Sequence, residues 1–203
     1  MEEQGTGLTG PFTSQLRGAD RPSWDFATAA RRVMAHLRDR MGFGLWMVTR
    51  AAGDDWIVLD TLGSGSDVKA GDVLPWSDSL CRHMVAGEGP RIAPRSREVA
   101  AYRYAGLART MPVAAYVGMP IHRPDGSLFG TLCALDPEAQ PEVVAAELPL
   151  VELLTDLLAS VLAYELGTLG DARRAEKAAL ESDTDPLTRL PDRRAWARSL
   201  EAE

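Results

Sequence analysis

Hydrophobic and polar positions alternate with two different periods along the first part of the chain. In residues 24–41 apolar side chains recur every three to four positions, which predicts a helix with one buried face and Ser23 as its N-cap. Residues 45–49 and 56–61 are strand-like runs joined by the turn sequence Ala52-Gly-Asp-Asp55. The pattern therefore predicts a helix followed by an antiparallel hairpin.

The middle of the chain predicts short helices between turns. Residues 62–72 are rich in glycine and serine and are expected to form a connection. Ser77 or Asp78 can cap a helix over 79–86, and weaker helical character follows over 99–108.

A second hairpin is predicted where strand-like runs over 114–122 and 127–135 flank Arg123-Pro-Asp-Gly126. Proline presets its own φ and glycine accepts a positive φ, so Pro-Asp-Gly is a turn signal. Gly118 and Gly130 lie inside these strands, where glycine costs stability unless another group must approach the backbone closely. With helical sequence following, the order of elements favours an antiparallel sheet flanked by helices.

The last third of the chain has helical periodicity, and Pro149 either kinks this helix or lies in the first turn of a new one. Its apolar run over 148–167 is interrupted by Glu152, Asp156 and Glu165. These charges indicate an amphipathic helix and not a membrane span.

Part of this helix carries the spacing of a contact between two helices. Apolar residues recur at alternating intervals of three and four, at Val151, Leu154, Leu158 and Val161. Farther on the stripe turns polar or small, and Gly167 and Gly170 weaken the helix. We expect one face to pack on the sheet and this seam to pair with a second copy in a parallel homodimer. The alternative is that the leucines pack only on their own sheet.

Composition narrows the class of protein. The chain has 203 residues, 45% of them hydrophobic and 25% charged, as in an ordinary globular domain. A net charge of −7 argues against nucleic acid as a partner. Cys81 and Cys133 show no CxxC spacing and are expected to be buried, reduced thiols of a cytoplasmic protein. Residues 1–22 lack a signal peptide and are expected to form a flexible leader.

Two stretches resemble a GAF domain: "WSDSLCRHMVAGEGPRIAP" at 76–94 and "YVGMPIHRPDGSLFGTLCALDP" at 116–137. The resemblance spans about residues 23–166. It implies an α+β fold with an antiparallel sheet of about five or six strands and a long C-terminal signalling helix. The first and last helices would cover one face of the sheet, and a small-molecule pocket would lie on the other.

The resemblance does not choose a ligand. GAF domains bind cyclic nucleotides, bilins, haem or small metabolites, and many have no known ligand. The cyclic-nucleotide motif begins with Asn-Lys, and this chain contains no asparagine. Bilin attachment often uses a cysteine directly before a histidine, whereas Arg82 separates Cys81 from His83. Haem would need His83 or His122 as an axial ligand. We expect neither haem nor bilin, and the sequence requires no cofactor or metal.

Candidate pocket residues follow from the same resemblance, with ordinary core packing as the alternative for each. They are Trp46, Trp76, Cys81, His83, Met84, Tyr104, Tyr116, Met119 and Cys133. Arg91, Arg103 and Arg109 could hold an anionic ligand through charge-assisted hydrogen bonds, with a solvated surface as the alternative.

The sequence "TDPLTRLPDRRAW" at 184–196 resembles the opening of a GGDEF domain, the diguanylate cyclase module. Arg189 stands where that family usually has glycine, and Asp192 where it usually has asparagine. The resulting division is a leader over 1–22, a GAF domain over 23–166, a signalling helix over 167–183 and a GGDEF start over 184–203. The matching positions are Asp185, Leu187, Thr188, Leu190, Arg193 and Arg194.

These resemblances imply the regulatory sensor and dimerisation region of a diguanylate cyclase, which controls cyclic di-GMP synthesis from GTP through a paired helix. The catalytic core of a GGDEF domain is missing, so we expect no catalytic residue and no enzyme activity in this chain itself. One alternative is a ligand-free dimerisation scaffold. Another is a thiol-based GAF reductase that uses Cys81.

Overall fold

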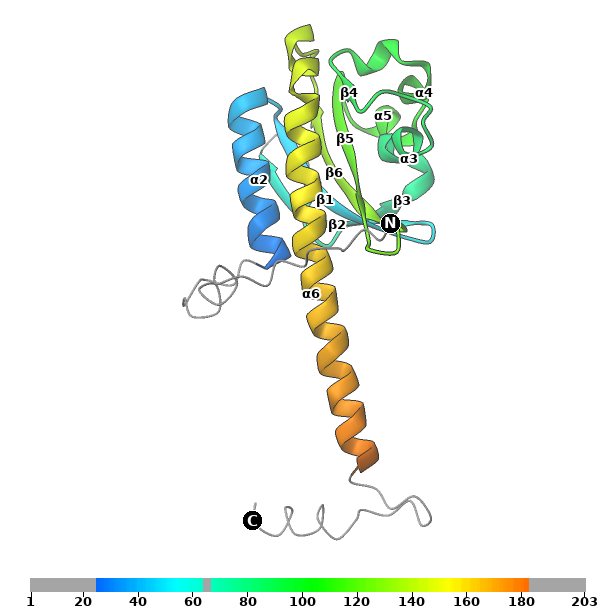
Figure 1. The fold of residues 1–203 in the computed structure, drawn as a ribbon. Coiled ribbons are helices and arrows are strands. Elements are labelled where there is room, and N and C mark those ends of the chain that lie inside the picture. Colours follow the sequence, from blue (N-terminus) through cyan, green and yellow to red (C-terminus); the bar gives the residue numbers. More distant parts are fainter. Residues whose placement is uncertain (1–24, 64–66, 183–203) are drawn as a thin grey trace, which may run out of the picture.

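The computed structural model describes residues 25–63 and 67–182, which fold around one twisted antiparallel sheet (Figure 1). Each strand pairs antiparallel with its neighbours. The predicted sheet of five or six antiparallel strands is therefore confirmed. The strand order is β3 (Val73–Pro75), β2 (Asp55–Gly63), β1 (Leu45–Ala52), β6 (Leu128–Asp136), β5 (Ala115–His122) and β4 (Ile92–Ala93).

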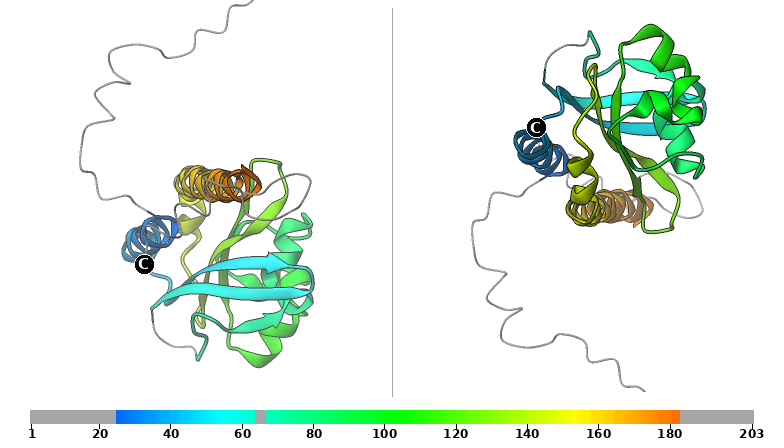
Figure 2. Two further views of the ribbon diagram at one scale, coloured as in Figure 1. Left: turned by 90° about the horizontal axis from the view of Figure 1, so that it is seen from below. Right: turned by 90° about the horizontal axis from the view of Figure 1, so that it is seen from above.

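Helices cover both faces of this sheet. α2 (Phe26–Met41) and α6 (Leu148–Ser182) lie side by side on one face, as Figures 1 and 2 show. The other face carries the short helices α3 (Leu80–Val85), α4 (Ala100–Arg103) and α5 (Gly106–Thr110), with 3₁₀ turns at Trp76–Asp78 and Ser96–Glu98. A third 3₁₀ turn, Glu142–Glu147, leads into α6.

The helix boundaries correct some of the sequence predictions. Asp25 caps α2 instead of Ser23, because its Oδ1 accepts the Thr28 N–H at 2.7 Å. Ser79 caps α3 instead of Ser77 or Asp78, with its Oγ accepting the Arg82 N–H at 3.1 Å. The single weak helix expected over 99–108 is two short helices, α4 and α5.

Two hydrophobic clusters fill the two sides of the sheet because side chains of a strand alternate between its faces. Trp46, Val48, Val117 and Met119 point toward α2 and α6. On the opposite side, strand, α3 and loop residues form the second cluster, which includes Leu45, Met47, Trp56, Leu80, Cys81, Met84, Tyr102, Tyr116, Cys133 and Leu135.

Gly130 shows why glycine is needed inside a strand. It pairs with Arg50 across β1 and β6, and a Cβ at this position would lie 1.8 Å from the Thr49 carbonyl oxygen. The expectation of a close backbone approach at this residue is confirmed.

α6 is the longest element and extends well past the sheet (Figure 1). Pro149 lies in the first turn of α6, so of the two alternatives it begins a new helix and does not kink an existing one. Where the helix leaves the domain, Glu165 Oε2 accepts the N–H of Phe26 at 2.8 Å, the first amide of α2. In the described part of the chain, no helix combines the length and the apolarity that crossing a bilayer requires. The expected leader over 1–22 and the GGDEF-like segment over 184–203 lie outside the described residues.

Candidate functional site

The strongest concentration of buried polar groups lies between α3 and the strands β5 and β6. Ser79 starts α3 so that Leu80, Cys81 and Met84 face the sheet. β5 and β6 present Tyr116 and Cys133 to the same side. Cys81 Sγ therefore lies enclosed between the helix and the sheet and is 1% exposed.

Several donors converge on the Cys81 sulfur. Tyr116 Oη donates to Sγ at 3.4 Å, and Thr131 Oγ1 lies 3.3 Å away in donor geometry. Cys133 belongs to the same buried cluster. A sulfur atom that receives this many hydrogen bonds is placed as an acceptor, which favours the thiolate over the thiol.

A chain of hydroxyl groups leads from Trp56 to the sulfur of Cys81. The indole nitrogen of Trp56 is only a donor, and it donates to Thr49 Oγ1 at 2.8 Å. Thr49 Oγ1 lies 3.2 Å from the carbonyl oxygen of Thr131, to which it can donate, and 2.8 Å from Thr131 Oγ1. The hydroxyl of Thr131 in turn lies 3.3 Å from Cys81 Sγ. Two threonine hydroxyls thus connect the Trp56 indole to the sulfur.

The pKa values follow from this arrangement. Burial raises the pKa of Cys81, but hydrogen bonds from Cys133, Thr131 and Tyr116 outweigh burial and hold it below the ordinary thiol value. The hydrogen bond to Cys81, together with burial and the charge on that sulfur, raises the pKa of Cys133 well above its usual range. Burial and the same charge raise the pKa of Tyr116. Of these three groups, Cys81 is therefore the one whose ionised form the site favours.

Aromatic rings fill the space beside this sulfur. The Tyr116 ring lies over the backbone of Gly118, where an added Cβ would be 1.8 Å from the phenol oxygen. Tyr102 packs against Tyr116 edge to face with ring centroids 4.9 Å apart, and its Oη donates to Pro90 O at 2.5 Å. Gly89 makes room for the Tyr102 ring, since its Cβ would lie 2.5 Å from that ring. The close approach predicted at Gly118 is thus made by a tyrosine of the same strand.

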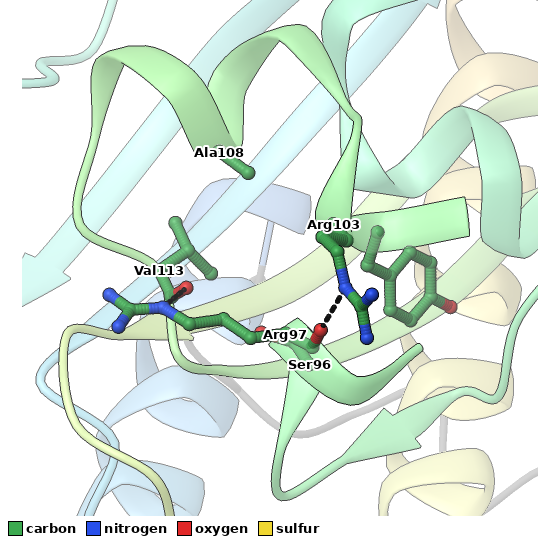
Figure 3. Close-up of a pocket in the computed structure, with 6 residues that line it drawn as sticks. Ser96, Arg97, Arg103, Ala108 and Val113 are labelled. Atoms are coloured by element: carbon green, nitrogen blue, oxygen red, sulfur yellow. Dashed lines mark hydrogen bonds between the residues drawn. The ribbon is translucent and has the colours of Figure 1, made fainter. Parts of the chain in front are cut away.

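An open cavity lies on the outer side of this layer. It has a volume of about 310 Å³ and is lined by Ser96, Arg97, Tyr102, Arg103, Ala108 and Val113 (Figure 3). Tyr102 belongs both to the cavity wall and to the buried aromatic pair. The Tyr102 ring therefore separates the cavity from Tyr116, and Tyr116 in turn contacts Cys81.

A model of the GAF domain family matches residues 25–162, more than half of the chain. The chain belongs to the GAF domain family. A relative is the diguanylate cyclase DgcP of Escherichia coli (strain K12), which is 40% identical over 95 residues. That match spans 46% of this chain and 27% of DgcP, so the chain covers about a quarter of the relative's length.

Solved GAF domains share the fold at low sequence identity. The GAF domain of the Acinetobacter phosphoenolpyruvate-protein phosphotransferase is 16% identical, with 76% of this chain and 89% of that chain covered and a TM-score of 0.56. The GAF-B domain of DevS from Mycobacterium smegmatis is 19% identical, with coverages of 74% and 99% and a TM-score of 0.53. At these identities the likeness concerns the fold alone.

The structure of this GAF domain brings together only part of the predicted pocket. Cys81, Met84, Tyr116 and Cys133 meet in the second cluster, and Trp76 packs at its edge. These side chains pack against one another, which is the alternative that the sequence left open.

The other predicted pocket residues lie elsewhere. Trp46 and Met119 belong to the cluster under α2 and α6, on the opposite face of the sheet. Tyr104 is 75% exposed and does not line the cavity. His83 is partly buried, and its Nδ1 lies 2.5 Å from Glu88 Oε2. These positions correct the single pocket that the sequence predicted.

The sequence analysis missed several residues of the site. Thr131 lies two residues before Cys133 in β6 and therefore shares its face, a signal that strand alternation offered. Tyr102 and Arg97 carried no local signal, because their roles depend on how loops pack over the sheet. Thr49 is opposite Thr131 across β1 and β6, and the sequence alone does not give that strand pairing.

The predicted helix seam also needs correction. Val151 and Leu158 are 0% and 1% exposed and lie in the core of their own GAF domain, with Leu154 and Val161 packed against it. Val151 and Leu158 are therefore unavailable for contact with a second copy, whereas Leu154 and Val161 are only partly buried. The exposed apolar residues of α6 are Leu153 at 57%, Leu157 at 54%, Tyr164 at 76%, and Leu166 and Leu169.

Proposed function

We propose that this GAF domain is the regulatory sensor and dimerisation region of a diguanylate cyclase, and that α6 carries its signal to the catalytic domain. The observation that carries the proposal is the helix itself. α6 is rooted in the domain core through Val151, Leu158 and Leu162 and then continues to Ser182. It ends directly before the segment over 184–196 that resembles the opening of a GGDEF domain. The partial identity to DgcP supports the same domain order.

A paired helix gives this arrangement a mechanism. Two GGDEF domains must each present a GTP to the other, so their relative placement sets the rate of cyclic di-GMP formation. A change in the GAF domain acts on that placement only as far as it favours one arrangement of the two helices over another. Because the root of α6 packs on β5, a shift of that strand would reach the helix directly.

The face available for pairing is the exposed stripe of Leu153, Leu157 and Tyr164. With Ser160 these residues follow the alternating spacing of four, three and four that two packed helices share. Each fully buried apolar side chain contributes about 1.5–3 kcal/mol, and association entropy offsets much of the sum. A homodimer of modest affinity follows.

Insertions in α6 test the proposal in the complete gene product, with cyclic di-GMP formation from GTP as the measurement. Two alanines after Ala172 rotate everything downstream by roughly 200° relative to the domain. Seven alanines at the same point leave the phase within roughly 20° and serve as the matched control. We expect the two-residue insertion to change the rate strongly and the seven-residue insertion to preserve it. Equal rates in both variants, or no cyclic di-GMP from the parent, would refute the proposal.

One observation favours a second function, a ligand-free dimerisation scaffold. The rings of Tyr116 and Tyr102 occupy the sheet face on which a small-molecule pocket was expected. A scaffold predicts the same insertion phenotype but no response to any ligand. The reductase alternative gains no comparable support, because Cys81 is enclosed and an oxidised methionine would not reach its sulfur.

A further inference from the structure

We infer that the cavity lined by Arg97 and Arg103 is a binding site for a small organic oxyanion, a carboxylate or a phosphate ester. Both arginines come from the segment that covers the second cluster, at Ser96–Glu98 and in α4. The inference concerns binding alone and stands apart from the proposed cyclase function.

The two guanidinium groups are held in place by the main chain. Arg97 Nε donates to Val113 O at 3.0 Å, and Arg103 Nε donates to Arg97 O at 2.8 Å. Figure 3 shows Arg103 reaching to the main chain of Arg97, while Arg97 reaches toward Val113. Each anchor uses Nε and leaves the terminal nitrogens for another acceptor. An anchored guanidinium loses less entropy when it binds an oxyanion.

No carboxylate neutralises either group in the part of the chain that the structure describes. The neighbouring Glu98 is paired with Arg95 instead. Six other arginines of the described chain do pair with acidic residues, among them Arg31 with Asp60, Arg40 with Glu147, Arg91 with Glu152 and Arg95 with Glu142.

The remaining residues of the cavity lining indicate the size and polarity of the ligand that would fit. Tyr102, Ala108 and Val113 supply an apolar surface, and Ser96 is nearly fully buried at the cavity wall. A site with an apolar floor and a few placed polar groups suits a molecule with one charged end and a compact carbon skeleton. The volume of about 310 Å³ lies at the small end for ligand sites, which excludes groups the size of haem.

A ligand in this cavity would touch the buried network. Tyr102 lines the cavity and packs on Tyr116, which donates to Cys81. Contact with the ligand therefore changes the surroundings of the Tyr102 ring, which gives a local readout of binding.

Titration of the isotope-labelled 203-residue protein tests the inference, with inorganic phosphate and benzoate as probes at constant ionic strength. We expect saturable shifts of the Tyr102 ring resonances with at least one probe. Arg97→Gln and Arg103→Gln should each weaken binding at least tenfold. Arg109→Gln, in α5 but outside the cavity lining, is the matched control and should bind as the parent does.

A second variant keeps the test decisive if an arginine substitution disturbs the loop. Ala108→Leu fills the cavity from a partly exposed position and leaves both guanidinium groups in place. It should abolish the shifts while the circular dichroism and melting temperature stay close to those of the parent. Unsaturable shifts with both probes, or equal binding by Arg109→Gln, Arg97→Gln and Ala108→Leu, would overturn the inference.

Discussion

The phenol oxygen of Tyr116 lies 1.8 Å from the point where a Cβ of Gly118 would stand, so this tyrosine and this glycine require each other. Gly118→Ala must push the Tyr116 ring out of a closely packed cluster, and we expect a loss of about 1–3 kcal/mol in the free energy of unfolding. Urea denaturation gives the value. Tyr116→Ala combined with Gly118→Ala should cost less than the sum of the two single changes. Additive costs would mean that the two side chains do not compete for this space.

Gly167→Ala is the matched control for Gly118→Ala and should increase stability instead of decreasing it. Gly167 lies in α6 with nothing within 4 Å of an added Cβ. Alanine is the better helix former, so the variant should gain about 0.5–1 kcal/mol of local helix stability. Hydrogen exchange of the amides around residue 167 would detect the gain. Faster exchange in the alanine variant would contradict it.

The hydrogen bonds at Cys81 predict a buried thiol whose pKa is lowered in the folded protein. Ultraviolet absorbance of the thiolate, measured against Cys81→Ser, should show Cys81 titrating below the ordinary thiol pKa. Tyr116→Phe keeps the ring but removes one donor, so the pKa of Cys81 should rise. Tyr104→Phe, an exposed tyrosine, is the control and should leave the titration unchanged. An unchanged pKa in Tyr116→Phe would show that the phenol does not stabilise the charge.

Acid should destabilise the fold through surface carboxylates. The hydrogen bond from Arg31 lowers the pKa of Asp60, and that from Arg40 lowers the pKa of Glu147. A carboxyl group with a lowered pKa in the folded state binds protons more tightly when unfolded, so its stabilisation is present above about pH 4 and is lost below it. Urea midpoints should therefore be flat from neutral pH to about pH 5 and fall at lower pH.

Removal of the arginines isolates this effect. Arg31→Gln with Arg40→Gln should be less stable than the parent at neutral pH and should lose less stability in acid. The two proteins should converge once the carboxyl groups are protonated in both states. Parallel pH profiles for parent and variant would show that other groups cause the acid transition.

The two faces of α6 predict two different phenotypes. Leu153→Glu with Leu157→Glu changes exposed residues and should convert a dimer to a monomer in analytical ultracentrifugation, with the fold intact. Leu158→Ala removes a core side chain and should cost about 2–5 kcal/mol of stability without a direct effect on association. A dimer that survives both glutamates would place the interface elsewhere.

Local signals were enough to predict most of the fold. Ala52-Gly-Asp-Asp55 and Pro-Asp-Gly define hairpins without help from distant residues, and both hairpins are present. Gly126, for example, has the positive φ of 79° that its turn requires. Gly118 also signalled a close approach correctly, but not which group approaches it.

It was harder to predict which face of a helix or strand each residue occupies. Leu153 with Leu157 and Leu154 with Leu158 are equally good helical pairs, and only the position of the sheet decides which pair is buried. The alternation of side chains along a strand could have shown that the predicted pocket residues do not share one face. Tyr116 and Met119 are three residues apart in β5 and must therefore face opposite sides of the sheet. The arginine-lined cavity depends on loop packing that no short sequence pattern encodes.

Glu165 marks the point at which the long helix makes its hydrogen bond to α2. Its carboxylate accepts the first amide of α2, so the two helices share one anchor at that residue. Gly167 and Gly170 follow within a turn and a half, and glycine is a weak helix former. We therefore expect bending or twisting of α6 relative to the domain to begin just beyond this carboxylate.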